Sequence, residues 1–283
     1  MANNSFSMKF SYMAAPLEDT SDAAFRSICH KYGADLTFTE MVHVTSLARD
    51  NQSSWRRLQF PDNTPVQIQL LPAQEADLEK FLSVFKPFEG FKGINFNLGC
   101  PSPNVTHAGL GCAMIKRISK VEKMIGIVRS FNYPVSIKMR LGLNHYEKEK
   151  KAYLNLIKKV NPDFFVVHAR HGKQTYDKPA DFSVFDGCIA TGKRIIANGD
   201  IDSKEKVEFL RKKGAAGVMT GRAAVKDLGI FNRLKGFDAP NSAQLRQEYL
   251  KRAEKFKIDP RYVKNVLKRL GKNSKAMDKD LLI

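Results

Sequence analysis

Eight short apolar runs alternate with amphipathic segments between residues 8 and 237, and this alternation restricts the fold more than any other feature. The runs have the length of buried strands, and most of the segments between them repeat apolar residues at helical spacing. Predicted strands cover residues 10–13, 36–39, 66–70, 94–97, 135–139, 164–168, 195–197 and 218–220. Predicted helices cover residues 22–32, 45–58, 73–85, 121–130, 147–160, 203–213 and 223–235. The connection over residues 171–193 is irregular and carries at most a short helix.

This order of elements predicts a (β/α)8 barrel, the α/β fold of the TIM-barrel class. Eight alternations over ~230 residues suit a closed barrel better than an open sheet. An open dinucleotide-binding sheet carries a glycine-rich turn after its first strand, and residues 13–16 (Met-Ala-Ala-Pro) form no such turn. Ser21 and Ser203 are predicted helix caps, and Gly33 and Gly214 stand where helix ends need a left-handed residue.

The composition changes after Pro240, where two further helices are predicted. Ser242 opens the first helix, and Asp259-Pro260 starts a second one that ends at Gly271. We therefore divide the chain into a catalytic barrel (residues 1–238) and a short basic helical extension (residues 239–283). The extension carries 12 basic residues against 5 acidic ones. It is either a docking arm or a packing helix pair with a solvated face, and the sequence leaves both open.

The whole chain is strongly basic, with 47 Lys and Arg against 29 Asp and Glu and a formal net charge of +18. This charge indicates a polyanionic partner, most often nucleic acid, although general solubility also explains it. No apolar run approaches the ~18 residues that span a bilayer. The amino terminus has no basic segment followed by an apolar one, so we predict a cytoplasmic protein.

The four cysteines are scattered, which argues against a structural metal or disulfide framework. Cys29, Cys100, Cys112 and Cys188 form no Cys-x-x-Cys pair and have no histidine at metal-ligand spacing. We therefore predict no metal site and a reducing compartment. Cys100 differs from the others because it follows a strand in a Gly-Cys-Pro turn that holds its thiol in place; the alternative is a buried, inert cysteine.

Polar residues cluster at the predicted carboxyl ends of the strands, where barrels of this class build their sites. Lys138 points inward if Ile137 and Met139 face the helices, and a buried lysine needs an anionic or polar partner; the alternative is a lysine that reaches out to solvent. His168 ends an apolar strand, and this position taken by itself predicts a histidine in the core. The Gly221-Arg222 pair places backbone N–H groups at a helix start, which suits a phosphate. Together these signals indicate a phosphorylated cofactor across the barrel mouth.

Nine segments in the same order resemble the tRNA-dihydrouridine synthases and cover essentially the whole barrel. They are Met13-Ala14-Ala15-Pro16; Asp22 with Phe25-Arg26; Phe38-Thr39-Glu40-Met41; Val66-Gln67-Ile68-Gln69-Leu70; Asn97-Leu98-Gly99-Cys100-Pro101; Val135-Ser136-Ile137-Lys138-Met139-Arg140-Leu141-Gly142; Val167-His168-Ala169-Arg170; Ala197-Asn198-Gly199-Asp200; and Met219-Thr220-Gly221-Arg222.

The resemblance implies an FMN-dependent enzyme that reduces the C5–C6 double bond of a uridine in tRNA, with NADPH or NADH as reductant. Hydride passes from reduced FMN to C6, and Cys100, neutral at rest, gives a proton to C5. Asn97 hydrogen-bonds the uracil, and Arg170 lies near the substrate side. The target base leaves its stack to reach the site. We expect a monomer. The residues implied to hold FMN are Pro16, Leu17, Glu18, Gln69, Lys138, His168, Asn198, Gly199, Asp200, Gly221 and Arg222.

The chain departs from the family pattern in two places that bear on function. Asn95 stands two residues before Asn97, where the family usually carries an acid. The family also adds about four helices after its barrel for tRNA docking, and residues 239–283 have room for about two. The identity of the target uridine therefore stays open.

Two other functions are compatible with parts of this pattern. One is a different flavin barrel that acts on a free pyrimidine, as a dihydroorotate dehydrogenase does; its sequences can carry an Asn-Leu-x-Cys-Pro-Asn run. A free small acid needs no strongly basic surface, which argues against this reading. The other is a non-catalytic tRNA-binding protein, against which the intact Cys100 and the complete cofactor set argue.

Overall fold

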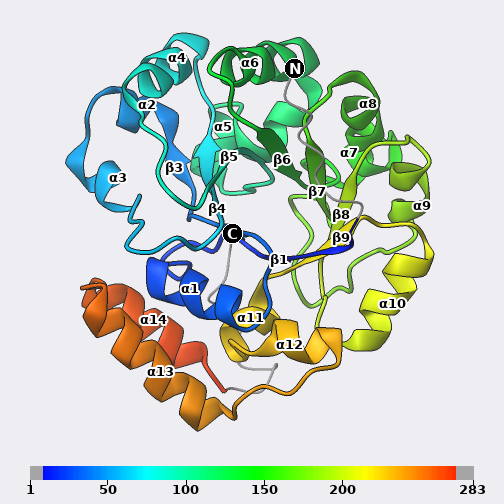
Figure 1. Cartoon of the computed structure of the whole chain (residues 1–283). Helices are drawn as coiled ribbons and strands as arrows, with labels where there is room; N and C mark the ends of the chain where they lie inside the picture. Colours follow the sequence, from blue (N-terminus) through cyan, green and yellow to red (C-terminus); the bar gives the residue numbers. More distant parts are fainter. Residues whose placement is uncertain (1–8, 272–283) are drawn as a thin grey trace.

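The computed structural model describes residues 9–271, and its centre is a parallel β-barrel surrounded by helices (Figure 1). Each strand pairs in parallel with its neighbour in the following order: β1 (Ser11–Ala14), β9 (Gly217–Thr220), β8 (Ile195–Asn198), β7 (Phe164–His168), β6 (Val135–Met139), β5 (Phe91–Leu98), β4 (Val66–Leu71) and β2 (Thr37–Phe38). A bridge between Met13 and Leu36 joins β1 to the start of β2, so the two ends of the sheet meet. The short β3 (Val42–His43) pairs with the end of β4. The predicted (β/α)8 barrel is confirmed.

Helices cover the outside of the barrel between successive strands. They are α1 (Ala23–Lys31), α2 (Val44–Ala48), α3 (Gln52–Arg56), α4 (Glu75–Val84), α5 (Pro103–His107), the 3-10 helix η1 (Gly111–Lys116), α6 (Ile118–Ser130), α7 (His145–Glu149), α8 (Ala152–Lys159), α9 (Val184–Ile189), α10 (Lys204–Lys212), α11 (Arg222–Lys226) and α12 (Ile230–Lys235). Across residues 9–271 no helix has both the length and the apolar character needed to cross a bilayer.

Three segments predicted as single helices are each divided in two. Asp50 (φ 54°) separates α2 from α3, and Lys151 (φ 53°) separates α7 from α8. A residue with a left-handed backbone cannot continue a right-handed helix. The apolar periodicity of the sequence continues across both breaks, so it could not predict them. The third division lies between α11 and α12, where Asp227 adopts an extended conformation.

One predicted helix cap is wrong, and the other is confirmed. Asp22, not Ser21, caps α1: its carboxylate accepts the Phe25 N–H at 2.9 Å. The Ser21 hydroxyl instead bonds both the N–H and the carbonyl of Leu17 at 3.0 Å, one turn earlier. Ser203 caps α10 as predicted. Gly33 and Gly214 also end their helices with φ of 105° and 97°, a region that glycine occupies without strain.

The strands bury alternate residues inside the barrel and against the helices. On β7, Phe164 and Val166 join the small apolar cluster inside the barrel, while Phe165 and Val167 belong to the outer core beneath the helices. The inner cluster fills only the lower part of the barrel, because polar side chains replace apolar ones toward the carboxyl ends of the strands. This change leaves a polar mouth above an apolar floor.

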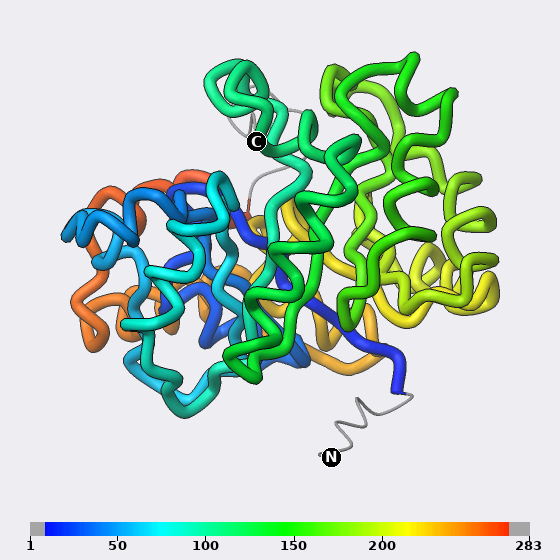
Figure 2. The backbone as a smooth tube through the Cα atoms, turned by 90° about the horizontal axis from the view of Figure 1, so that it is seen from above, coloured from blue at the N-terminus to red at the C-terminus, as the bar shows by residue number. Residues whose placement is uncertain are grey.

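Two carboxy-terminal helices, α13 (Ser242–Lys255) and α14 (Pro260–Arg269), lie against the outside of α1 and α11 (Figures 1 and 2). The Tyr249 hydroxyl, fully buried, donates to Asp22 at 2.8 Å. Glu248 accepts from Lys31 at 2.6 Å and from Tyr32 at 2.7 Å. The pair is therefore anchored to the barrel by one buried polar contact and two more exposed ones, as well as by apolar packing.

Candidate active site

A cavity of about 470 Å³ opens at the carboxyl ends of the strands. It brings together residues that are far apart in the sequence, because the ends of parallel barrel strands converge on one face. Of the residues predicted for the site, the following line this cavity: Pro16, Leu17, Glu18, Gln69, Asn97, Cys100, Lys138, His168, Asn198, Gly199, Asp200, Gly221 and Arg222.

Cys100 lies in a turn that its neighbour Asn97 holds in place. The Asn97 side-chain oxygen accepts the N–H groups of Gly99 at 2.9 Å and of Cys100 at 2.8 Å. Only 4% of Cys100 is exposed, and burial raises the pKa of its thiol above the ordinary value. The hydrogen bond from the Ser102 backbone and the charges of Arg140 and Lys138 act in the opposite direction but do not outweigh burial. The thiol is therefore protonated at neutral pH, as a proton donor must be.

A continuous chain of buried hydrogen bonds links Asn97 to the lower part of the barrel. Asn97 donates to Gln69 at 2.9 Å, and Gln69 donates to Asn95 at 2.7 Å. Asn95 donates to the Ser136 hydroxyl at 2.7 Å, which donates to Gln67 at 2.5 Å. Asn95 acts as donor to Ser136, which an ionised acid at this position could not do. Each side chain in this series both donates and accepts a hydrogen bond. The hydrogen bonds therefore determine how every side-chain amide is oriented.

Replacing Ser136 with alanine is expected to lower the free energy of unfolding by about 1–3 kcal/mol, because one buried donor (Asn95) and one buried acceptor (Gln67) lose their partner. Urea unfolding monitored by circular dichroism measures this change. Ser83→Ala is the matched control: its hydroxyl makes one exposed bond to the Lys80 carbonyl, so its effect should stay within about 0.5 kcal/mol. Equal free energies of unfolding for the two variants would show that the chain of buried hydrogen bonds does not stabilise the barrel.

Two further cavity residues carry nitrogen atoms suited to an anionic or polar ligand. Burial, with help from Arg140, lowers the pKa of Lys138 to about 8. Burial also lowers the pKa of His168 well below its ordinary value, so its ring is neutral. The Nδ1 atom of His168 is buried and has no hydrogen-bond partner within residues 9–271. Because this atom belongs to a residue that lines the cavity, a bound ligand can supply the missing hydrogen bond.

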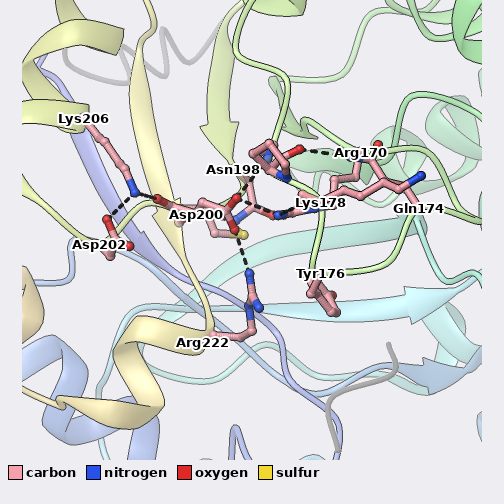
Figure 3. A network of polar contacts seen from close by, with 12 residues as sticks. Arg170, Gln174, Tyr176, Lys178, Asn198, Asp200, Asp202, Lys206 and Arg222 are labelled. Atoms are coloured by element: carbon pink, nitrogen blue, oxygen red, sulfur yellow. Dashed lines mark hydrogen bonds and ion pairs between the residues drawn. The ribbon is translucent and has the colours of Figure 1, made fainter. Parts of the chain in front are cut away.

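Asp200 lines the cavity and binds groups that follow β7 and β9 (Figure 3). Its carboxylate accepts from Arg170 at 2.6 Å, from Arg222 at 2.7 Å and from the Ala180 N–H at 2.9 Å. Burial acts to raise the pKa of Asp200, but the bonds from Arg170 and Ala180 outweigh it and hold that pKa below its ordinary value. One ionised carboxylate thus ties β7, β8 and β9 together at the cavity edge.

Comparison with known proteins agrees with this geometry. The family described as dihydrouridine synthase (Dus) matches residues 13–279. The chain belongs to the dihydrouridine synthase family. The match spans the barrel and both carboxy-terminal helices, so the family resemblance seen in the strand-end motifs is confirmed over nearly the whole chain.

Relatives of this chain come from bacteria and animals. A probable tRNA-dihydrouridine synthase of Helicobacter pylori is 32% identical over 231 residues, covering 78% of this chain and 69% of the relative. The tRNA-dihydrouridine synthase B of Vibrio cholerae is 25% identical and covers 84% and 74%. A rat protein named tRNA-dihydrouridine(47) synthase [NAD(P)(+)]-like is 28% identical over 78% of this chain. The chain spans only about 35% of the length of that rat relative.

Among solved structures, a nitroalkane oxidase from Streptomyces ansochromogenes superposes with a TM-score of 0.50 at 11% sequence identity. The superposition covers 84% of this chain and 70% of the oxidase. At this identity the likeness concerns the barrel fold alone.

Arg170 lies away from the place that the sequence predicted for it. It was expected near the substrate side, but it is absent from the cavity lining and only 1% of its side chain is exposed. Its guanidinium donates to Asp200 and to the Lys178 carbonyl, at 2.6 Å in each case (Figure 3). Arg170 therefore holds the segment after β7 against β8 and makes no direct contact with the cavity.

Tyr176 lines the cavity and was missed because the segment after β7 has no regular periodicity. Its ring lies beneath three guanidinium groups, at 5.7 Å from Arg140, 5.2 Å from Arg170 and 4.1 Å from Arg222. Arg140 also lines the cavity and donates to the Tyr176 hydroxyl at 3.2 Å. The one sequence signal was an aromatic residue in an otherwise polar stretch directly after a strand end.

Proposed function

We propose that this member of the dihydrouridine synthase family is an FMN-dependent oxidoreductase that reduces the C5–C6 double bond of a uridine in tRNA. The observation that carries the proposal is a buried, protonated thiol, Cys100, in the same cavity as every residue expected to hold FMN. Family membership supports the class of reaction.

The residues of the cavity fit a flavin with a phosphate group. His168 has a buried Nδ1 without a hydrogen-bond partner, and Lys138 forms no ion pair with a carboxylate within residues 9–271. Gly199 has a φ of 115°. A Cβ on Gly221 would stand 3.4 Å from Ala15 and 3.6 Å from Leu17, so a side chain there would narrow the cavity. Glycine at both positions lets a ligand approach the backbone closely.

When bound, FMN supplies hydride-transfer chemistry, and the protein supplies orientation and a proton. The Cys100 thiol is the donor of the proton to C5 of the uracil. The Asn97 side-chain oxygen already accepts two hydrogen bonds from the Cys100 turn. Only the side-chain N–H of Asn97 is left to bind the uracil, and this donor suits a carbonyl oxygen of the base. Lys138 adds positive charge at the cavity wall, where it favours an anionic ligand.

Two measurements test the proposal. Purified protein should be yellow with flavin absorbance, and tRNA from cells that lack the gene should lose dihydrouridine at one or more positions. If no position loses dihydrouridine, the proposal fails. Flavin-free protein that still binds tRNA would indicate a non-catalytic binder, and reduction of a free pyrimidine alone would indicate another flavin oxidoreductase.

Uridine reduction should fall steeply with added salt, because tRNA docking to a chain with a net charge of +18 releases counterions. Between 50 and 200 mM salt we expect at least a ~10-fold fall in the rate at limiting tRNA. Reduction of the bound flavin by NADPH, measured on the same samples, is the control and should change far less. Equal salt responses of the two steps would contradict a docking role for the basic extension, residues 239–283.

We also propose NADPH or NADH as reductant, a monomeric enzyme and a cytoplasmic location. The rat relative carries NAD(P)(+) in its name, which supports the reductant. All four cysteines are free, which suits a reducing compartment. The same proposal divides the chain into a barrel (1–238) and a tRNA-docking extension (239–283). It includes no metal site.

A further inference from the structure

The last helix, α14, makes polar contacts with the loop that follows β1. Asn265 donates to the Asp19 carbonyl at 3.2 Å, and Arg269 donates to the Thr20 hydroxyl at 3.2 Å. Arg261 forms an ion pair with the Asp19 carboxylate at 3.3 Å. Three residues from successive turns of α14 therefore meet one short loop that lies almost 250 positions earlier in the chain.

Glu40, at the end of β2, joins the same loop to the same helix. Only 3% of Glu40 is exposed, and its carboxylate accepts the Tyr262 hydroxyl on one oxygen. The other oxygen accepts the Asp19 N–H at 3.1 Å. Arg57 lies 3.5 Å from this oxygen and donates to Glu18 at 2.6 Å.

Carboxylate oxygens of Glu18, Asp19 and Glu40 approach within 4.8 Å of one another, a spacing that a cation could use. Arg57 and Arg261 form ion pairs with Glu18 and Asp19, and the Tyr262 hydroxyl donates to Glu40, so each carboxylate has a compensating partner. Glu18 Oε2 and Asp19 Oδ1 are nevertheless buried without a hydrogen bond within residues 9–271.

The loop bears directly on the cavity. Leu17 and Glu18 line the cavity, and the next residue, Asp19, has a left-handed backbone with φ of 50°. A non-glycine residue in this region is strained and keeps that conformation only when its surroundings hold it. Glu40 holds the Asp19 N–H, and Asn265 holds its carbonyl. Support for this wall of the cavity therefore comes from Glu40 after β2 and, through Asn265, from α14 outside the barrel.

We propose that Tyr262 is a positioning residue of the cofactor cavity. Through Glu40 it holds residues 17–20 in the conformation that places Leu17 and Glu18 in the cavity wall. The carboxy-terminal extension is then part of how the cavity is built, in addition to its proposed role in docking tRNA. This inference rests on the proposed function, because FMN is the ligand whose binding reports the shape of the wall.

Tyr262→Phe removes the hydroxyl and keeps the ring. In protein stripped of flavin and titrated with FMN, the dissociation constant from flavin fluorescence should rise about tenfold, because a hydrogen bond to a charged group is lost. Asn265→Ala removes a different support of the same loop and should raise the dissociation constant by a few-fold.

Tyr249→Phe is the matched control. It removes a buried tyrosine–carboxylate bond of the same kind from the neighbouring helix, but its partner Asp22 does not line the cavity. This variant should lose thermal stability and keep the FMN dissociation constant of the unaltered protein. A lower melting temperature with unchanged FMN affinity in Tyr262→Phe as well would overturn the inference and leave the proposed function standing. Failure of the unaltered protein to bind FMN would refute both.

Discussion

Replacing Cys100 with alanine is expected to lower the rate of uridine reduction in tRNA by about 10²–10⁴-fold, the usual contribution of a positioned general acid. Of the four cysteines, only Cys100 lines the cavity, and its raised pKa keeps the proton in place at neutral pH. FMN binding and the reduction of FMN by NADPH should persist, because the thiol is needed only for the step at C5. Single-turnover formation of dihydrouridine on pre-reduced enzyme measures the effect.

Cys188→Ala is the control for that experiment. Cys188 is also buried, but it lies in α9 away from the cavity, so dihydrouridine formation should stay close to that of the unaltered enzyme. If Cys100→Ala loses FMN itself, Cys100 has a structural role. If it forms dihydrouridine at the normal rate, the proton comes from another group.

Replacing Asp200 with alanine is expected to produce the largest loss of stability, about 3–5 kcal/mol, because it leaves a charge buried without its partner. Arg170 has 1% of its side chain exposed and pairs with Asp200, and the Ala180 N–H would lose its acceptor as well. Urea unfolding of the flavin-free protein measures the change. Asp202→Ala is the control: its ion pair with Lys206 is largely exposed and should contribute at most about 1 kcal/mol.

The contribution of Asp200 should also depend on pH in a defined direction. Its pKa in the folded protein lies below the value of about 3.9 for an unfolded aspartate, so the unfolded state takes up a proton first as pH falls. The stabilisation is complete above the unfolded pKa and is lost as pH falls through the folded one. The difference in unfolding free energy between the unaltered protein and Asp200→Ala should therefore shrink below about pH 4. A constant difference from pH 7 to pH 3 would contradict the assignment of the ion pairs.

The strand-end residues show why so much of the candidate site could be predicted. Parallel strands of a barrel all end on one face, so a residue needs only its place in a strand to be assigned to that face. Lys138, His168 and Asn198 came together in one cavity for this reason. The alternation that turns Ile137 and Met139 toward the helices also assigned Lys138 to the interior correctly.

Features that depend on contacts between distant segments could not be predicted from the place of a residue in its strand. Tyr176 lies in an irregular segment, and its place beneath three arginines depends on how that segment folds back over the mouth. Arg170 follows His168 by two residues beyond the end of β7, yet it is buried because it forms an ion pair with Asp200. The helix breaks at Asp50 and Lys151 are backbone events, and apolar spacing continues across both.

The sequence by itself determined the barrel, the set of strand ends and the thiol at Cys100, because apolar periodicity and the order of elements along the chain can be recognised without the tertiary structure. Only the tertiary structure decided which polar groups satisfy one another. The bond from Tyr262 to Glu40 joins residues 222 positions apart, and the chain from Gln67 to Asn97 crosses three strands. Such pairings depend on which segments meet in space, and no spacing along the chain encodes them.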